Sequence, residues 1–260
     1  MDPLESGENV SLTYVTYSGA DYDETTEKIV RDGYGYLRKN VRVYDDEWLR
    51  ETKFFSLPSN RWLWETDWKR GDGWFAWKPI IMLLELERVG AALYSDSDTY
   101  PIAALSVIDK IVARDGAMFF QAGNHQNRQW CKRDCAIVMG QDDDKYLDAP
   151  AGNAAMFAMS SSWSTRQFLY EWLTYAVNRR ANTLDASVIA PEKPGFIEHR
   201  AEQSIMTMLC HKYGFKLWRD PSQHGEGIDR DRDVYGQLFY HQEGLTKAPS
   251  EPRGSRWRNV

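Results

Sequence analysis

The chain has 260 residues, of which 42% are hydrophobic and 13% aromatic, enough for one large packed domain or two small ones. A formal net charge of −6 argues against a general affinity for nucleic acid or for an anionic membrane. There is no run of about 18 apolar residues, and Met1 to Ser6 are polar and acidic, so the sequence predicts neither a transmembrane helix nor a secretory signal. We therefore expect a cytoplasmic protein.

The three cysteines, Cys131, Cys135 and Cys210, give no sign of a disulfide framework or a zinc site. The Cys-x3-Cys pair lacks a second pair of Cys or His at the spacing of structural zinc sites. Cysteines of a cytoplasmic chain stay reduced. We expect free thiols, most of them buried.

The first predicted element is a strand over Val10 to Tyr17, which is rich in β-branched and aromatic residues and is closed by Ser18-Gly19. A helical pattern over Glu24 to Val30 follows, then a strand over Val41 to Tyr44 and a helix around Glu47 to Lys53. A strand, a glycine-containing turn and a helix are typical of the start of a nucleotide-binding α/β unit. The spacing is not G-x-G-x-x-G, so a dinucleotide cofactor is not indicated.

An amphipathic helix is predicted over Ile80 to Val89, with Pro79 in its first turn, where proline is well tolerated. Lys78 then lies at the helix N-terminus. The backbone N–H groups and the helix dipole favour an anion there, and a cationic side chain adds to that field. The position suits a diphosphate.

A short apolar strand over Ala91 to Tyr94 leads directly into Asp96 and Asp98. Ligands of open α/β sheets bind at the carboxyl ends of strands. Two carboxylates one residue apart can converge there on a divalent cation, or on a cation and a ribose hydroxyl. Two other acidic clusters, Asp142 to Asp144 and Asp229 to Asp233, lack such a strand or depart from the calcium-loop pattern.

The stretch from Gly73 to Asp98 resembles the GT-A glycosyltransferases. It reads Gly-Trp-Phe-Ala-Trp-Lys-Pro, then a helix, a strand and Asp-Ser-Asp. This order is similar to that of capsular-polysaccharide and large-DNA-virus glycosyltransferases, which read Gly-Tyr-Gly-Tyr-Trp-x-Trp-Lys-Pro before a Tyr-x-Asp-x-Asp/Gly turn. The resemblance covers roughly residues 14–215. It implies a GT-A-like (Rossmann-like) α/β/α sandwich with a central, mostly parallel sheet, and for a viral chain the cytoplasm of an infected host cell.

The same resemblance implies roles for residues near the acidic turn. Asp96 and Asp98 would hold Mn²⁺ or Mg²⁺ against the diphosphate of a nucleotide sugar, with Lys78 assisting. Thr16 and Tyr17, at the end of the first strand, would line the nucleoside pocket. A simple strand end explains those two residues as well.

Further along, a helix is predicted over Ala104 to Ala113 and a strand over Ala117 to Gln121. A charged turn at Cys131 to Cys135 is then expected to lead into a strand that ends at Met139. Asp134 in that turn is a candidate acid of the site. It would equally suit a salt bridge with a neighbouring cationic side chain.

The segment Gly152 to Phe157 resembles the Asn-Ala-Gly segment that lies under the donor sugar in many GT-A enzymes, although Ala155 stands where Gly is usual. The resemblance implies that Asn153 binds the donor, and an amide can hold a sugar hydroxyl from either end. A long helix over Trp163 to Arg179, capped by Ser161 or Ser162, is predicted to be structural.

Residues His199 to Ser204 resemble the family's His-Arg-x-Asp-Gln-Ser, with Glu202 in place of the Asp, at the start of a helix that continues to Lys212. The resemblance implies a catalytic role for Glu202 and donor binding by Gln203. A carboxylate at a helix N-terminus also suits a simple cap.

Near the end, an apolar run from Val234 is followed by His241. In metal-dependent GT-A enzymes a late His often returns to the ion, and a neutral imidazole beside carboxylate and phosphate oxygens suits Mn²⁺. His224 is the rival ligand. A surface His explains either residue without a metal.

These observations predict one catalytic domain over residues 1–246 and a flexible tail over residues 247–260. We expect a metal-dependent transferase that moves a sugar from a nucleotide-diphosphate sugar, first of all a UDP-sugar, to a glycan hydroxyl. Glu202 is the first candidate and Asp134 the second for the base of an inverting reaction, or for stabilising the transition state of a retaining one. Two other classes stay open: a sugar-nucleotide hydrolase or nucleotidyltransferase, and a non-catalytic glycan-binding protein.

Overall fold

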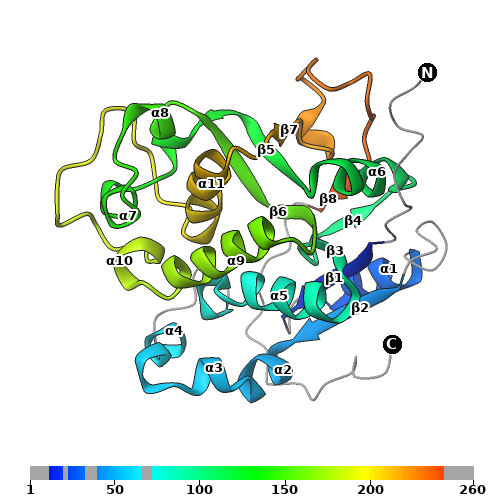
Figure 1. Ribbon diagram of the computed structural model, residues 1–260, viewed down its shortest axis with the longest axis horizontal. Helices are drawn as coiled ribbons and strands as arrows, with labels where there is room; N and C mark the ends of the chain where they lie inside the picture. Colours follow the sequence, from blue (N-terminus) through cyan, green and yellow to red (C-terminus); the bar gives the residue numbers. More distant parts are fainter. Residues whose placement is uncertain (1–11, 20–22, 33–39, 66–71, 243–260) are drawn as a thin grey trace.

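The computed structural model describes residues 12–19, 23–32, 40–65 and 72–242, and a six-stranded sheet forms its centre (Figure 1). The strand order is β2-β1-β3-β6-β5-β7. The strands are β1 (Thr13–Ser18), β2 (Val41–Asp45), β3 (Ala91–Ser95), β5 (Ala117–Gln126), β6 (Pro150–Ser160) and β7 (Leu217–Trp218).

All strands of this sheet except β6 run in one direction. β1 is parallel to β2 and β3, and β5 is parallel to β7, whereas β6 lies antiparallel between β3 and β5. The expected mostly parallel sheet is therefore confirmed. Because the carboxyl ends of the parallel strands meet at one edge, that edge is where a ligand site is expected.

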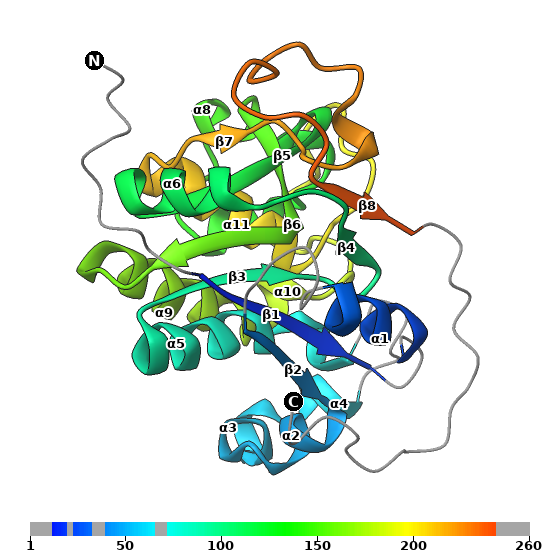
Figure 2. The same cartoon turned by 90° about the vertical axis from the view of Figure 1, so that its right-hand side faces the viewer.

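Helices cover both faces of the sheet, as Figures 1 and 2 show. Side chains alternate between the faces along β3: Ala92 and Tyr94 join one buried cluster, and Ala91 and Leu93 join the other. The first cluster includes residues of α5 (Trp77–Val89), α9 (Trp163–Ala176) and α11 (Glu202–Tyr213). The second includes residues of α1 (Asp23–Asp32) and α6 (Ser106–Asp115). The expected α/β/α sandwich is confirmed.

A second, two-stranded sheet lies next to the end of β3. β4 (Thr99–Pro101) pairs antiparallel with β8 (Phe239–His241), so that Thr99 is opposite His241 (Figure 2). This pairing returns the C-terminal part of the described chain to the acidic turn.

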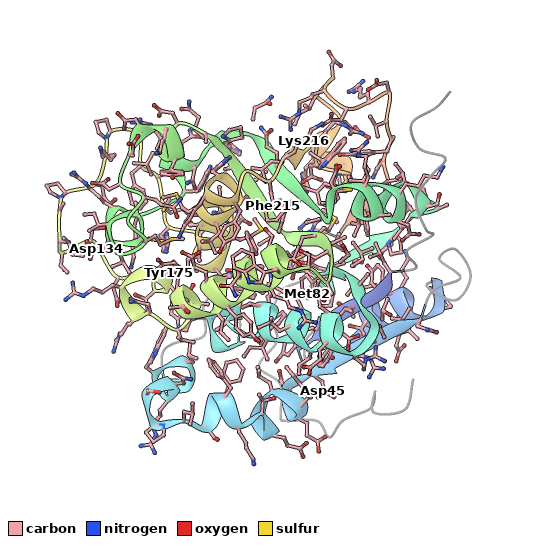
Figure 3. All side chains as sticks on the ribbon, viewed as in Figure 1. Asp45, Met82, Asp134, Tyr175, Phe215 and Lys216 are labelled. Carbon is pink, nitrogen blue, oxygen red and sulfur yellow. The ribbon has the colours of Figure 1, made fainter. Side chains whose placement is uncertain are left out.

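The expected strand ending at Met139 is wrong, because these residues form the helix α7 (Arg133–Val138). The buried apolar side chains in this stretch are Cys135, Ala136 and Met139, a helical spacing, while Ile137 and Val138 are only half-buried. An apolar run this short does not distinguish a strand from a helix. Asp134 lies on α7 and is labelled in Figure 3.

The long helix expected to reach Arg179 ends at Ala176. Asn178 begins a new helix, α10 (Arg179–Asn182), since its side chain accepts from the N–H groups of Arg180 and Ala181. Of the two predicted N-cap candidates for α9, Ser161 and Ser162, the structure has Ser162.

Short helices complete the described chain. They are α2 (Asp46–Glu51), α3 (Lys53–Ser56), η2 (Pro58–Asn60), α4 (Trp62–Glu65), η3 (Asp72–Phe75), η4 (Asn127–Gln129), α8 (Asp144–Leu147) and η5 (Gln223–Gly225). No helix among the described residues has the length and apolar character needed to cross a bilayer. The three cysteines are buried and unpaired, as expected. The predicted tail, residues 247–260, lies outside the described ranges.

Candidate active site

The acidic turn follows β3 at the carboxyl edge of the sheet, where the sequence predicted a ligand site. The backbone N–H of Asp96 donates to the Ala155 carbonyl at 2.8 Å, and that of Thr99 donates to the Asp96 carbonyl at 3.0 Å. The turn therefore rests on β6 on one side and leads into β4 on the other. Both acidic side chains are about one-quarter exposed, at 28% for Asp96 and 24% for Asp98.

The Asp96 carboxylate is held from inside the protein. Its Oδ1 lies 3.0 Å from the Lys78 Nζ and accepts from the Tyr94 hydroxyl at 2.5 Å. Burial, and next to it the negative charge of Asp96, raise the pKa of Tyr94 well above its ordinary value, so the hydroxyl stays a donor.

Lys78 lies in the first turn of α5, as predicted, and its ammonium joins two acids. The Nζ donates to the Ala154 carbonyl at 3.1 Å and to Glu202 Oε1 at 3.1 Å, in addition to its contact with Asp96. Burial alone would lower the pKa of Lys78, but the charges of Asp96 and Glu202 outweigh it and leave the pKa raised. Because an ammonium has three protons and three acceptors surround this one, Lys78 orients protein groups here, and its side chain is only 2% exposed.

Glu202 is the first residue of α11 and is buried. Burial raises the pKa of its carboxyl, and Lys78 opposes that rise. Gln203 follows it and is half-buried.

Non-glycine residues with positive φ precede both helices that supply this ion network. Trp74 and Phe75 have φ of 52° and 57° before α5, and Ala201 has φ of 49° before α11. Each such residue costs on the order of 1–3 kcal/mol and persists only where its surroundings enforce it. Strain of this kind is common in functional sites, and here it lies next to Lys78 and Glu202.

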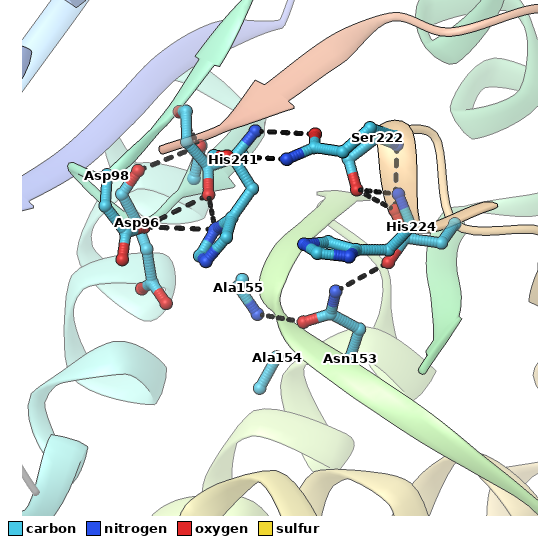
Figure 4. Close-up of polar contacts among 12 residues, drawn as sticks. Asp96, Asp98, Asn153, Ala154, Ala155, Ser222, His224 and His241 are labelled. Atoms are coloured by element: carbon cyan, nitrogen blue, oxygen red, sulfur yellow. Dashed lines mark hydrogen bonds and ion pairs between the residues drawn. The ribbon is translucent and has the colours of Figure 1, made fainter. Parts of the chain in front are cut away.

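Asp98 and His241 face each other across the β4–β8 pair (Figure 4). The His241 Nδ1 lies 3.6 Å from Asp98 Oδ1 and 2.9 Å from the Thr99 hydroxyl. Burial and the charge of Asp96 raise the pKa of Asp98, and His241 opposes them. His224, the other predicted candidate for the metal ligand, lies next to His241, with ring centroids 5.4 Å apart.

The donor set fits a hard divalent cation only in part. Asp98 and His241 supply one carboxylate and one imidazole with about one-quarter to one-third of each side chain exposed, but Asp96 is turned toward Lys78. Within the described ranges, no three His, Cys, Asp or Glu side chains are grouped closely enough to hold a metal ion by themselves. A cation at Asp98 and His241 would need further oxygen ligands, such as those of a diphosphate.

Asn153 lies where β6 departs from regular pairing with β5. Phe119 is opposite Phe157 but Phe120 is opposite Asn153, so residues 154–156 form a bulge. The Asn153 Oδ1 accepts from the Ala155 N–H at 2.9 Å, and its Nδ2 donates to Asp220 Oδ2 at 2.9 Å. The bulge supplies the two carbonyls that hold Lys78 and the Asp96 backbone.

No protein-family model matches this sequence, and no curated protein matches it either. Solved structures do match its fold. The bifunctional glycosyltransferase WbbM, in its apo structure, aligns over 94% of the chain with a TM-score of 0.53 at 10% identity, and the chain spans 47% of that protein. The chain has the GT-A fold.

Two other solved structures align with this chain, with lower TM-scores. Mouse xyloside xylosyltransferase 1 in its apo form aligns with 12% identity over 92% of this chain and 100% of its own, with a TM-score of 0.49. A glycosyltransferase involved in glycosylation of the major capsid of PBCV-1 aligns with 11% identity over 89% and 93%, with a TM-score of 0.37.

Two predicted donor-binding residues at the start of this GT-A domain present little surface. Thr16 is fully buried and Tyr17 is 6% exposed. Tyr17 stacks on Trp77 with ring centroids 4.0 Å apart, and its hydroxyl donates to Asp46. Their part in a nucleoside pocket stays a prediction.

Asp134 lies apart from the acidic turn in the GT-A domain, on α7 at the other end of the molecule from β4 and β8 (Figures 1 and 3). Its carboxylate accepts from the backbone N–H groups of Val188 and Ile189 at 3.0 and 2.8 Å, and so fixes the loop between α10 and α11. Tyr94 and Asp220, which sequence reasoning missed, contact Asp96 and Asn153 directly. A Tyr two residues before an Asp was a visible signal, whereas Asp220 carried none.

Proposed function

We propose that this chain is a glycosyltransferase that moves a sugar from a nucleotide-diphosphate sugar, first of all a UDP-sugar, to a hydroxyl of a glycan. The observation that carries the proposal is the facing pair Asp98 and His241, beside the Lys78-bound Asp96, at the carboxyl edge of a GT-A sheet. Fold alone does not define an activity, but this edge is where the chemistry of such sheets is located.

Asp98 and His241 are the residues that would hold Mn²⁺ or Mg²⁺. Asp96 is bound by Lys78, and its 28% exposed side chain is our candidate for a further contact with the ion or the ribose. Such an ion, when bound, neutralises the charge that develops on a leaving diphosphate. The protein's own contribution is to fix the carboxylates: Tyr94 and Lys78 hold Asp96, and Thr99 donates to Asp98 at 3.1 Å. Gln203 remains our candidate for contact with the donor sugar, whereas we do not carry Asn153 forward in this role, because both ends of its amide are engaged, one by Asp220 and one by the Ala155 N–H.

Glu202 is our candidate for the carboxylate on the acceptor side. Burial raises the pKa of the Glu202 carboxyl, which makes it a stronger base than an exposed carboxylate, and Lys78 keeps it in position. In a retaining reaction the same carboxylate would instead stabilise positive charge on the sugar. We do not carry Asp134 forward in this role, because its oxygens are engaged by the 188–189 backbone.

Nucleotide binding tests the site first. We expect one of UDP, GDP and ADP to raise the melting temperature in the presence of Mn²⁺, by the equivalent of about 2.7 kcal/mol at a ligand concentration of 100 times Kd. Asp98→Ala should abolish the shift. Asp144→Ala is the matched control, since Asp144 belongs to another Asp-x-Asp of the chain, begins α8 and forms ion pairs with Arg128 and Lys193.

Transfer is then tested with the matching nucleotide sugar. Release of nucleotide that speeds up when a glycan acceptor is added, with the sugar recovered on the acceptor, supports a transferase. Release of free sugar at the same rate with or without acceptor indicates a hydrolase. If no nucleotide shifts the melting temperature, or if Asp98→Ala keeps full turnover, the proposed function is wrong.

A further inference from the structure

Asp220 is a buried acid with no role in the chemistry described above. It follows β7 and is 1% exposed. Its Oδ2 accepts from Asn153 Nδ2 at 2.9 Å, and its Oδ1 accepts from the N–H and the hydroxyl of Ser222 at 2.8 and 2.6 Å. Burying a carboxylate costs desolvation free energy. A buried carboxylate that accepts hydrogen bonds only from neutral donors therefore fixes local geometry at a cost in the free energy of folding.

The first contact of Asp220 leads to the Lys78 half of the site. Asn153 Nδ2 points to Asp220, which leaves Asn153 Oδ1 to accept from the Ala155 N–H. That bond shapes the β6 bulge. The bulge carbonyls hold the Lys78 ammonium and the Asp96 N–H.

The second contact leads to the His241 half of the site. Ser222 caps η5, with its hydroxyl accepting from the His224 N–H at 3.3 Å. Gln223, in the same turn, binds the His241 backbone from both sides, since its Nε2 donates to the carbonyl at 2.6 Å and its Oε1 accepts from the N–H at 2.9 Å. His241 in turn faces Asp98.

The turn is packed directly on the Asp220 backbone. A Cβ atom at Gly225 would lie 2.0 Å from the Asp220 carbonyl oxygen, so only glycine fits. Figure 4 shows Asn153, Ser222, His224 and His241 around one space, with Asp96 and Asp98 at its far side.

We propose that Asp220 is a positioning residue of the active site, which holds the Asp96–Lys78 half and the Asp98–His241 half in fixed relation, so that both reach one nucleotide diphosphate. The last clause rests on the proposed function. The positioning of the two halves by Asp220 is argued from the hydrogen bonds alone and is independent of that function.

An exchange of the two side chains provides the test. Asp220→Asn leaves a single acceptor oxygen facing donors from Ser222 and Asn153, so a bond is lost. Asn153→Asp sets two carboxylates against each other. The double variant Asp220→Asn/Asn153→Asp keeps every bond, because the new amide donates to the new carboxylate, which still accepts from the Ala155 N–H.

We expect each single variant to lower kcat/KM by about tenfold to a hundredfold, the effect of a misplacement of about 1 Å. The double variant should return to within about threefold of the wild type, because the two positions act through one bond. Glu85→Gln is the control: Glu85 is equally buried but binds Tyr44 and Arg88, so its loss should lower the melting temperature and leave kcat/KM unchanged.

Amide hydrogen exchange of the Ala155 and His241 N–H groups, measured by NMR, tests the positioning role of Asp220 independently of enzyme activity. Exchange should quicken in Asp220→Asn and recover in the double variant. Unchanged exchange, or a loss of melting temperature in Asp220→Asn with kcat/KM intact, overturns the inference. Absence of nucleotide binding and transfer by the wild type would instead overturn the proposed function, and the exchange result would still decide the role of Asp220.

Discussion

The Lys78 ammonium forms ion pairs with two carboxylates, those of Asp96 and Glu202, and holds both toward the protein interior. Its side chain and that of Glu202 are almost completely buried, at 2% and 6% exposure. Removing one member of a buried ionic group leaves the others uncompensated, which is a far larger effect than losing a surface ion pair.

Lys78→Met should therefore lower the free energy of unfolding by about 3–5 kcal/mol. The raised pKa of Lys78 means that its contribution is complete below the ordinary lysine pKa of 10.5 and is lost only as the pH rises through the higher folded-state value. The loss should not shrink as the pH rises from about 6 to 9, because Lys78 keeps its charge there and, without Lys78, the pKa of the buried Glu202 carboxyl would rise further. Urea unfolding at several pH values measures it.

The control is the double variant Lys78→Met/Glu202→Gln, which removes one of the two stranded charges and should regain part of the stability. A cost below about 1 kcal/mol for Lys78→Met would mean that the buried ions are already solvated or protonated, and that the network is not what holds Asp96.

The element that shapes the site is β6, the strand that runs against the others. β6 runs antiparallel to β3 and passes the carboxyl end of β3. Two main-chain carbonyls from the middle of β6 therefore reach the Asp96 N–H and the Lys78 ammonium. α11 fixes the strand from the other side, since the Gly152 N–H donates to the Thr207 hydroxyl at 2.9 Å.

Gly152→Ala tests how tightly α11 and β6 are packed. The new methyl group would lie 2.8 Å from Met206 Cε and 2.9 Å from Thr207 Oγ1. Methionine can move, but the Thr207 hydroxyl is tied to the strand, and overpacking of this kind costs about 1–3 kcal/mol. Gly227→Ala, where a Cβ meets nothing within 4 Å, should stay within about 0.5 kcal/mol in the same unfolding assay. Equal stability of the two variants would show that the helix can shift away.

Regular elements were predicted well where their signal was local. The strands over 41–44, 91–94 and 117–121 were visible because runs of apolar and β-branched residues define buried strands. The sequence does not predict α7, because its apolar run, residues 135–139, is too short to show a clear period. The β6 bulge depends on its register with β5, which is a property of two distant segments and not of either sequence alone.

At the scale of the whole molecule, the site is assembled from positions far apart in the chain. Lys78 meets Glu202 across 124 positions, and Thr99 meets His241 across 142. The resemblance to GT-A enzymes pointed to Lys78, Glu202, Asp98 and His241 as parts of one site. It did not disclose that Lys78 binds carboxylates, nor that Asp220 ties the parts together, because those facts are decided by which acceptor lies nearest in the folded state.

The interior as a whole should protect the three thiols. Cys131, Cys135 and Cys210 are buried, and burial raises the pKa of the Cys210 thiol well above its ordinary value, so the reactive thiolate is scarce. In the native protein, reaction with a thiol reagent should be at least about a hundredfold slower than in urea, since it requires opening of the core. Three thiols per chain should react once unfolded.

Reductant should leave the melting temperature unchanged, because no disulfide links the described cysteines. A thiol that reacts at once in the native protein would show that this part of the interior opens readily.

The two carbonyls of the β6 bulge belong to Ala154 and Ala155, and this has a practical consequence for mutagenesis. A conventional alanine scan passes over both positions, because they are alanine already, and most other side chains there would leave the oxygen atoms in place. Replacing the amide by an ester, which weakens the carbonyl as an acceptor, reaches them where side-chain exchange does not.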